Sequence, residues 1–564
     1  MNKPAALVLG LLSFSFGLGS IRAEAHAPVQ GQFSTATAAC TDRENWSYGL
    51  GIQAAWRQRF TKVPTDKRAA VLYFTNAYAI RTTSTLSETQ ALGEYAMGRA
   101  FFGLKMLHLA HDKFNSTLSM PENPTTDGIK LATLECLNVI HKNYPTLTLS
   151  KESAHSLQAM LTSNLTEPQK MQVYGALAEY LERLPNFEVE KEIFETVRAV
   201  GIYGSYLSTL NAARTGDDAE VIRNAEAFLK TAAVDGVIKT ATLLPDDIKD
   251  RVDGVHLILG QAYYELGKYA EATTQFRAVK NTSNYLSQSL TNLSWSYLMN
   301  TRYDDALGAA RNLLLGGLAR TFAPEANVVT AISFVETCHF AEALQSVKLF
   351  RDSYRNSYAW LYNWNQALPG SGNLYDKAVK YLKKKETLPD RIATEWIRSP
   401  VFLATQEELN LMYDERAAGK WANYTLGQLY KANKKLQPYL VPLQTLVNRD
   451  AANSANLEHT LVARVNLDLV KRSKQMLVSI ADLWENGQLI EVESYNQVGD
   501  KIVQDQFGAE VKEIAKNMKK NKRDEGAVWD WGRAPASDGS GEFWEDELGF
   551  LKATLVSQCS NKKR

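Results

Sequence analysis

Residues 254–276 read Gly-Val-His-Leu-Ile-Leu-Gly-Gln-Ala-Tyr-Tyr-Glu-Leu-Gly-Lys-Tyr-Ala-Glu-Ala-Thr-Thr-Gln-Phe, and this stretch decides the fold. The pattern returns 34 residues later, where Leu293 stands for Leu259 and Tyr297 stands for Tyr263. A fixed period of this size is typical of stacked helix-turn-helix units, each of which buries its apolar face only against its neighbours. The sequence therefore predicts a helical repeat protein, and it leaves open what the repeats bind.

Three repeat units follow one another at 253–286, 287–320 and 324–356. Small side chains allow the two helices of a unit, and neighbouring units, to approach closely, and aromatic side chains fill the remaining space. A glycine between the two helices suits the left-handed backbone of a tight turn. The structural positions of the repeat are Gly260, Tyr263, Gly267, Tyr269, Ala272, Tyr297, Tyr303, Ala306 and Ala343, and the residues that match the turn glycine are Thr301 and Cys338.

The same spacing occurs nearer the N-terminus. Within 91–124, Gly98 and Phe114 have the separation of Gly260 and Phe276 in the first clear unit, so we expect a unit of the same kind there. The remainder of 61–250 indicates degenerate helical repeats. Helices are expected at 128–142, 151–163, 167–183, 188–200, 203–214 and 217–231.

The pattern over 253–356, about a fifth of the chain, resembles the tetratricopeptide repeat (TPR). It departs from that family where a Trp often opens the motif, because His256 and Leu290 stand there. The resemblance implies an α-solenoid whose concave side, lined by the first helix of each unit, receives a protein segment. The inward-facing positions it implies are Leu257, Gln261, Tyr264, Glu265, Thr291, Trp295, Leu298, Met299, Val328, Ile332, Val335 and Glu336.

This predicted groove is apolar and aromatic, and it lacks the Lys/Arg clamp with which some TPR proteins grip a C-terminal carboxylate. An apolar helix or an extended segment is therefore the expected occupant. The alternative is that the chain's own later helices fill the groove, above all the long helical pattern that begins near Asn453. Both interpretations stay open at this point.

Beyond the repeats, 357–452 is predicted to be helical, and 453–525 to form a long helix or a coiled-coil hairpin packed on the solenoid or on a partner. Pro438 and Pro442 are expected to interrupt the chain before it. The apolar positions of the long helix are Leu457, Leu461, Val465, Leu469, Met476, Ile480 and Leu483 and, after Gly487, Val492, Tyr495, Val498 and Ile502.

The N-terminus has the features of a secretory signal. Residues 1–25 contain Lys3, an apolar run over 5–18 and small residues suited to cleavage, and 26–60 follows as a leader. No other stretch approaches twenty apolar residues, the length that spans a membrane. We therefore expect secretion across the inner membrane into the periplasm, with an extracellular location as the alternative.

The chain has four cysteines, Cys40, Cys136, Cys338 and Cys559. In an oxidising compartment they allow up to two disulfides, with three possible pairings. Cys136 lies in an apolar helical run and could instead be an ordinary core residue. Cys338 falls on a predicted turn, so we expect it to be partly exposed.

Charge and motifs point away from several classes of function. Lys plus Arg number 63 and Asp plus Glu 62, which gives no reason to expect nucleic acid as the main partner. His108 and His111 could share a metal ion, but polar-face histidines are the favoured interpretation. The basic stretch 512–523 favours a solvated helix end over an anionic surface. We predict no catalytic residue, no metal site and no cofactor.

The C-terminal segment, 526–564, is rich in Trp and acidic residues. The run Gly-Glu-Phe-Trp-Glu-Asp-Glu-Leu-Gly at 541–549 resembles the C-termini of envelope TPR proteins of gliding and predatory bacteria, which implies a part in assembling a motility-type machine. One alternative is a cap that covers the last exposed helix face of the solenoid. Another is a glycan-binding or hydrolytic site, for which the candidate residues are Trp529, Trp531, Trp544 and Glu547.

Together these features predict an all-α protein: a TPR-like α-solenoid of helical hairpins, followed by long helices and a Trp-rich C-terminal cap. The expected function is a non-enzymatic protein–protein interaction scaffold of the bacterial cell envelope. Its expected partners are other envelope proteins, with no nucleic acid, and with membrane association only through those partners. The alternative function is a secreted glycan-binding or hydrolytic protein.

Overall fold

A computed structural model describes most of the chain, and its described part is helical except for two short strands. The fold class predicted from the sequence, an all-α solenoid of helical hairpins, is therefore confirmed. No described helix is long and apolar enough to cross a membrane. The described residues are 40, 67–121, 124–144, 146–184, 186–234, 246–314, 318, 321–367, 372–432, 434, 437–505, 527–530, 552–555 and 557–559.

The first part of the solenoid follows the sequence prediction closely, and all six helices expected between 128 and 231 are present within a few residues. Helix starts carry the expected signals: the Ser150 hydroxyl accepts from the Ser153 backbone N–H, and Thr166 forms a capping box with Gln169. The elements are α4 (Lys67–Thr83), α5 (Ser87–Gly103), α6 (Leu107–Leu118), α7 (Pro124–Asn143), α8 (Lys151–Met160), α9 (Glu167–Glu182), η1 (Phe187–Glu190), α10 (Lys191–Arg198), α11 (Gly201–Thr215) and α12 (Asp218–Val234).

The clear repeats continue the stack, with each helix packed on the next. The turn between the two helices has the same backbone in four units: φ is 60° at Lys105, 72° at Gly267, 57° at Thr301 and 62° at Cys338. In each, the next residue's N–H donates to the carbonyl five residues earlier, which closes the helix end. The helices are α13 (Asp246–Glu265), α14 (Tyr269–Ala278), α15 (Leu286–Met299), α16 (Tyr303–Asn312), α17 (Glu325–Glu336) and α18 (Phe340–Gln366).

Close helix approach explains the small residues of the repeat. A Cβ added to Gly260 would lie 2.5 Å from the Phe276 ring, and one added to Gly98 would lie 2.5 Å from the Phe114 ring. The unit predicted at 91–124 therefore packs like the first clear unit. The other small and aromatic positions of the repeat are buried, as expected, at Ala272, Ala306, Ala343, Tyr263 and Tyr297, while Tyr269 and Tyr303 are half-buried.

The later helices are longer than the sequence predicted, and two predicted boundaries are wrong. α18 passes the expected end of the third unit at 356, and α22 begins at Gln437 rather than near 453. Pro438 and Pro442 do not interrupt α22. Pro438 is in the first turn, where no N–H is needed, and burial of Leu440 and Leu443, worth about 1.5–3 kcal/mol each, offsets the roughly 3 kcal/mol cost of Pro442. The remaining helices are α19 (Leu374–Leu382), α20 (Asp390–Ile397), α21 (Pro400–Ala432) and α22 (Gln437–Asp505).

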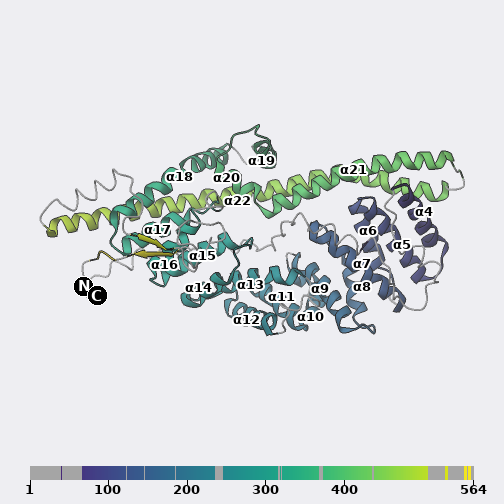
Figure 1. Ribbon diagram of the computed structural model, residues 1–564, viewed down its shortest axis with the longest axis horizontal. Helices are drawn as coiled ribbons and strands as arrows, with labels where there is room; N and C mark the ends of the chain where they lie inside the picture. The colour runs from purple at the N-terminus through teal and green to yellow at the C-terminus, as the bar shows by residue number, and fades with distance from the viewer. Residues whose placement is uncertain are drawn as a thin grey trace, which may run out of the picture.

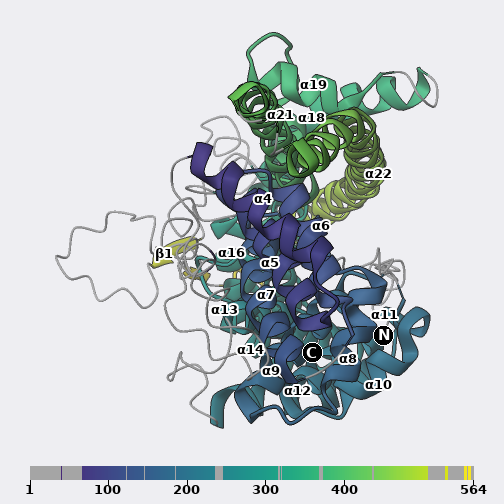
Figure 2. The same cartoon turned by 90° about the vertical axis from the view of Figure 1, so that its right-hand side faces the viewer.

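α22 spans the arc of the solenoid as a straight rod (Figure 1). Its first part pairs with α21 and contacts α4 and α6, and its later part contacts α17, α18, α19 and α20. Seen along the molecule, the α21–α22 hairpin lies on one side of the curved stack (Figure 2). The solenoid therefore touches the hairpin near both ends, while its middle helices, α9 to α14, curve away from it (Figure 1).

The buried face of α22 matches the apolar positions predicted for the long helix. Leu461, Val465, Leu469, Met476, Ile480 and Leu483 are all buried, and Leu457 is half-buried. Their spacing averages close to 11 residues per three turns, so one nearly straight stripe faces the solenoid. This stripe is the half of the predicted pattern that lies before Gly487.

Two strands pair in the C-terminal segment, and the sequence did not predict them. β1 (Ala527–Asp530) runs antiparallel to β2 (Lys552–Leu555), and β2 packs on α16. Several predictions lie outside the described residues: the signal at 1–25, the leader at 26–60 except Cys40, the basic stretch 512–523, the run 541–549, Trp531, Trp544 and Glu547. Of Trp529 the structure describes the backbone, which belongs to β1.

Candidate interaction surfaces

The predicted groove divides into a buried part and an accessible rim. Leu257, Trp295, Leu298 and Val328 belong to the core, so they present little surface to a partner. Most of the rest are half-buried, and the two acids are exposed. The half-buried residues are Gln261, Tyr264, Thr291, Met299, Ile332 and Val335, and the exposed ones are Glu265 and Glu336.

The chain's own later elements account for part of this burial. α22 packs on α17, and Leu555 of β2 packs on the buried cluster of Leu307, Phe334 and Ala343, on which the predicted groove residue Val335 also packs. This favours the alternative in which the chain fills its own groove. A partner in the groove would meet the rim residues rather than the aromatic floor.

A second apolar surface lies on α22 after Gly487. The predicted stripe continues through Val492 and Tyr495, but these side chains are 57% and 59% exposed, because the buried positions there are Ile490 and Ser494. With Leu489, which is 46% exposed, they form an apolar stripe along the outer side of α22. Of the two alternatives for this part of the pattern, packing on the solenoid or on a partner, Val492 and Tyr495 do not show the first. Val498 is half-buried, and the Ile502 side chain lies outside the described residues.

Aromatic contacts hold α22 against α18 next to this stripe, and we call Trp484, Phe350, Tyr358 and Arg351 the aromatic clasp. The Trp484 ring stacks on Tyr358, with centroids 6.0 Å apart, and meets Phe350 edge-on at 5.9 Å. Arg351 lies over the Trp484 ring and pairs with Glu491 at 2.6 Å. Gly487 lets the helices approach, since a Cβ there would lie 3.2 Å from Val347. The apolar stripe therefore stands on a rigid part of the helix.

The other end of the hairpin is held by a polar clasp, which we define as His108, Thr146, Glu408, Glu415 and Arg464. His108 is the second residue of α6, whose N-cap Met106 offers no side-chain acceptor. The Glu415 side chain of α21 supplies the missing acceptor. One of its carboxylate oxygens accepts a hydrogen bond from the His108 backbone N–H at 2.7 Å, and the other lies 2.6 Å from the ring Nδ1. A carboxylate at a helix N-terminus also opposes the positive end of the helix dipole.

Glu408 completes the polar clasp. Its carboxylate accepts a hydrogen bond from the Thr146 hydroxyl, lies 3.6 Å from His108 Nε2 and 4.0 Å from the Arg464 guanidinium. Burial disfavours a charged ring, but the Glu408 and Glu415 carboxylates outweigh it and raise the pKa of His108 to about 10. The histidine is therefore a cation at neutral pH, held between two buried carboxylates.

His111, one turn along α6, has a different environment. Its ring lies 5.4 Å from the His141 ring, and burial together with His141 lowers the pKa of His111 to about 3. His141 lines a small pocket with Glu179 and Arg183. Burial opposes ionisation of Glu179, but Arg183 and His141 hold the pKa of that carboxyl well below its usual range.

The metal site considered for His108 and His111 finds no geometric support. His108 pairs with Glu415 and His111 packs on His141, so the two rings serve different neighbours. Within the part of the chain that the structure describes, no group of three or more His, Cys, Asp or Glu side chains is placed to hold a metal ion.

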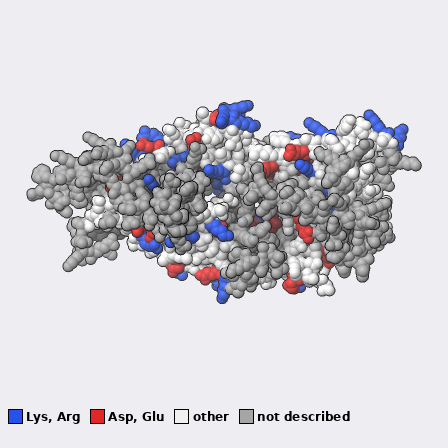
Figure 3. Space-filling view, viewed as in Figure 1, with Lys and Arg blue, Asp and Glu red and all other residues white. Residues whose placement is uncertain are grey.

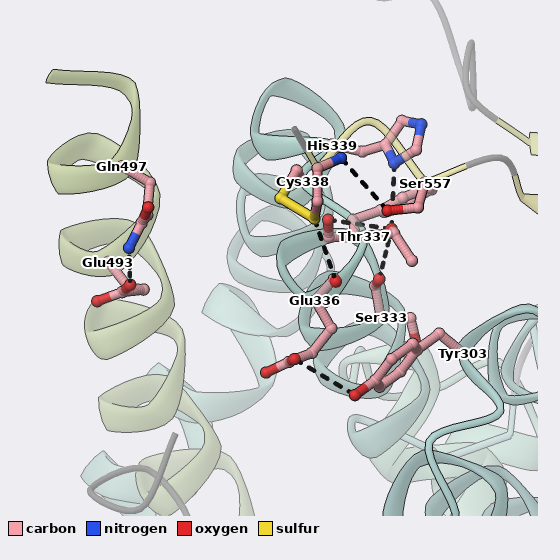
Figure 4. Close-up of a disulfide and its surroundings, with 11 residues drawn as sticks. Tyr303, Ser333, Glu336, Thr337, Cys338, His339, Glu493, Gln497 and Ser557 are labelled. Atoms are coloured by element: carbon pink, nitrogen blue, oxygen red, sulfur yellow. Dashed lines mark hydrogen bonds between the residues drawn. A yellow bond between two sulfur atoms is a disulfide. The ribbon is translucent and has the colours of Figure 1, made fainter. Parts of the chain in front are cut away.

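The four cysteines form two disulfides, Cys40–Cys136 and Cys338–Cys559. The first is fully buried beside Arg99, whose guanidinium donates to the Cys40 carbonyl. The second joins the α17–α18 turn to the C-terminal segment at the surface (Figure 4). Cys338 lies on a turn and is half-buried, as expected from its place in the repeat.

Sequence reasoning missed the partners of His108, although a signal for them exists. Glu408 and Glu415 are seven residues apart, two helical turns, on a face of α21 that also buries Met412 and Ala422. Two carboxylates on an apolar helix face need buried partners, so this pattern predicts an ionic contact. Nothing in the local sequence says that the partner is a histidine 307 residues earlier.

Charges elsewhere are interspersed. On the face in Figure 3, Lys/Arg and Asp/Glu side chains alternate without a large field of one sign over the residues that are described. That face gives no electrostatic reason to expect a highly charged partner. In comparisons with known proteins, no family model, no curated protein and no solved structure matches this chain.

Proposed function

We propose that this chain is a non-enzymatic protein–protein interaction scaffold of a bacterial cell envelope, built on TPR-like units. The observation that carries the proposal is the apolar stripe of α22, formed by Leu489, Val492 and Tyr495, each about half exposed. Exposed apolar side chains that lie next to one another on a rigid element are typical of interaction sites. Covering each one would contribute about 1.5–3 kcal/mol at most.

A partner helix suits this surface best. The stripe follows i, i+3 and i+6 along one side of a helix whose opposite side is buried through Ile490 and Ser494. Ridges of this kind pack into the grooves of a second helix. The rim of the predicted groove, Tyr264, Met299 and Ile332, is a second contact region that a larger partner would reach.

Two features support an envelope location. The first 25 residues have the composition of a secretory signal. All four cysteines are paired, and stable disulfides are characteristic of oxidising compartments such as the periplasm. The resemblance of 541–549 to envelope proteins of gliding and predatory bacteria supports a motility-type assembly as the setting.

The proposal is tested by crosslinking the mature protein in the envelope of cells that make it and identifying what it captures. Val492→Asp should reduce recovery of the specific partner by roughly tenfold, because a charge in an apolar helix contact is costly to bury. The matched control is Leu467→Asp on the same helix, an exposed leucine outside the stripe, which should recover the partner as the wild type does.

Equal recovery by wild type and Val492→Asp would contradict the proposed surface. Failure to capture any envelope protein, together with a hydrolytic activity lost on Glu547→Ala, would contradict the scaffold function and favour the alternative enzyme. The captured protein's own location decides the setting, since a cytoplasmic partner would contradict the envelope assignment.

A further inference from the structure

The C-terminal segment occupies an apolar face of the solenoid. Leu555 and Val335 each pack on a cluster formed by Leu307, Phe334 and Ala343, all three of which are fully buried. The strand that carries Leu555 contacts α16. This face therefore already binds an extended segment, and that segment comes from the chain's own end.

Beyond Leu555 the segment runs along the α17–α18 turn. The Gln558 N–H donates to the Thr337 carbonyl at 2.9 Å, and Cys559 Sγ lies 3.6 Å from the Glu336 carbonyl. The Cys338–Cys559 disulfide completes the attachment (Figure 4). The side chains of 557–559 are exposed, and the described side chain of this stretch that packs on the apolar cluster is the half-buried Leu555.

The two disulfides differ in access. Cys40 and Cys136 are both 0% exposed, and Cys40 sits against Arg99 inside the first units. Cys559 is exposed and Cys338 is half-buried on its turn. Because thiol–disulfide exchange needs direct approach of a thiolate to a sulfur atom, an external dithiol reaches the second disulfide and not the first.

We propose that Cys338–Cys559 is an exchangeable latch: when it is reduced, residues 552–559 leave the α16–α17 face, and the same residues of a second copy of this chain take their place. The face is complementary to these residues, whichever molecule supplies them. Exchange of an identical element between copies creates a dimer without requiring a new surface. Cys559 of one copy then meets Cys338 of the other in the present arrangement.

The chemistry is ordinary disulfide exchange. A thiolate of a dithiol reductant attacks the Cys559 sulfur, the Cys338–Cys559 bond breaks, and Cys338 leaves as a thiolate that takes up a proton. The second thiolate of the reductant attacks the mixed disulfide, so Cys559 leaves as a thiolate that takes up a proton from water, and the reductant departs as a cyclic disulfide. Reoxidation removes two electrons and two protons from Cys559 of one copy and Cys338 of the other, with a disulfide oxidant as acceptor.

The first test is selective reduction of the full chain by dithiothreitol, followed by alkylation and mass mapping. Cys338 and Cys559 should become labelled at a dithiol concentration at least about tenfold below that needed for Cys40 and Cys136. Simultaneous opening of both pairs, or earlier opening of Cys40–Cys136, would overturn the latch.

The second test asks whether the segment exchanges between molecules. Cys338→Ser and Cys559→Ser, one of them carrying a mass tag, are mixed and reoxidised. The expected product is a mixed dimer linked between Cys559 of one chain and Cys338 of the other. Only monomers, or only dimers linked through the same cysteine of two identical variants, would overturn the exchange.

Leu555→Asp in the chain that supplies Cys559 tests whether the mixed dimer forms because the exchanged segment packs on the apolar cluster, or only because free thiols collide at random. If the exchanged segment sits as in this structure, the mixed-dimer yield should fall by roughly fivefold or more, because the charge would face an apolar cluster. An unchanged yield would overturn the proposed seat. A mixture of Cys40→Ser and Cys136→Ser is the control, and it should give no mixed dimer because both thiols are buried.

Discussion

The two ends of the α21–α22 hairpin meet the solenoid by different physical means. Near α6 the polar clasp joins a protonated histidine to two buried carboxylates. Near α18 the aromatic clasp packs Trp484 against Phe350 and Tyr358. The first contact depends on protons and the second on apolar area, so conditions that weaken one should leave the other in place. The contrast predicts that the α21–α22 hairpin can loosen near α6 while α22 stays packed on α18.

Removing a large buried side chain where α20 packs on α22 should have the largest effect. Trp396 is 0% exposed, meets Trp360 edge-on, and donates its Nε1–H to Ser473 of α22 at 3.0 Å. Trp396→Ala should lower the free energy of unfolding by about 3–5 kcal/mol through the cavity it leaves. Guanidinium denaturation measures this, with Trp396→Phe as the control that keeps most of the volume. Equal, small losses in both variants would show that packing of Trp396 does not hold α22 against α20 and α18.

The polar end should respond to pH with a defined sign. The pKa of His108 is raised from 6.5 to about 10, so the folded state holds a proton that the unfolded state releases. The stabilisation is fully present below about pH 6.5 and is lost as the pH rises through about 10. Denaturation between pH 6 and 10 should show this slope, and His108→Gln should flatten it.

His111 supplies the matched control, because its pKa is lowered to about 3. Its contribution is present above pH 6.5 and is lost as the pH falls toward 3. His111→Gln should therefore flatten the acid limb and leave the alkaline limb unchanged. If His108→Gln and His111→Gln altered the same limb, the opposite environments assigned to the two histidines would be wrong.

A smaller loss of unfolding free energy is expected when the Glu415 carboxylate of the polar clasp is replaced by an amide. Glu415→Gln keeps the shape of the side chain but removes the charge that faces His108 and the N-terminus of α6. We expect a loss of about 2 kcal/mol, typical of a hydrogen bond to a charged group. Hydrogen exchange should report increased opening of α6 while α18 stays protected. Uniform loss of hydrogen-exchange protection along α22 would contradict the claim that the polar and aromatic contacts respond independently.

The smallest expected effect concerns the shared turn of the repeats. Thr301 adopts φ 57°, a left-handed backbone that costs a non-glycine residue about 1 kcal/mol, so Thr301→Gly should stabilise the protein by about that amount. The same substitution in the middle of a helix, Thr274→Gly in α14, should destabilise it by roughly 0.2–0.4 kcal/mol. Thermal melting of both variants measures the difference, and a fall in the midpoint for Thr301→Gly would contradict the assigned turn.

Local periodicity carried the sequence prediction of the fold. Gly260 and Gly267 marked the helix crossing and the turn, and Leu461 to Leu483 marked the buried face of α22, because these roles depend on neighbours close in sequence. The helix break predicted at Pro442 is wrong, because burial of the neighbouring leucines outweighs the local cost of a proline inside α22. The clasp of His108 by Glu415 could not be predicted, because it joins residues 307 positions apart.

The candidate site shows the same limit. The predicted groove depends on which residues face inward, and no local pattern indicated that Trp295 would be buried while Val492 would be exposed. Both side chains fit a helical period, but Trp295 lies on a buried face of α15, whereas Val492 lies on the side of α22 opposite the buried Ile490 and Ser494. Pairing of the cysteines was equally open, since three pairings satisfy the sequence and only the folded distances select one.

The most direct test of the proposed function is photo-crosslinking in the cells that make the protein. A photoreactive amino acid is placed in turn at Val492 on the apolar stripe, at Met299 on the groove rim and at Leu467 as the exposed control on α22. We predict a specific protein adduct from Val492, with none from Leu467. An adduct from Met299 without one from Val492 would place the binding site at the groove rim instead of the apolar stripe. No adduct from either position would contradict the scaffold function.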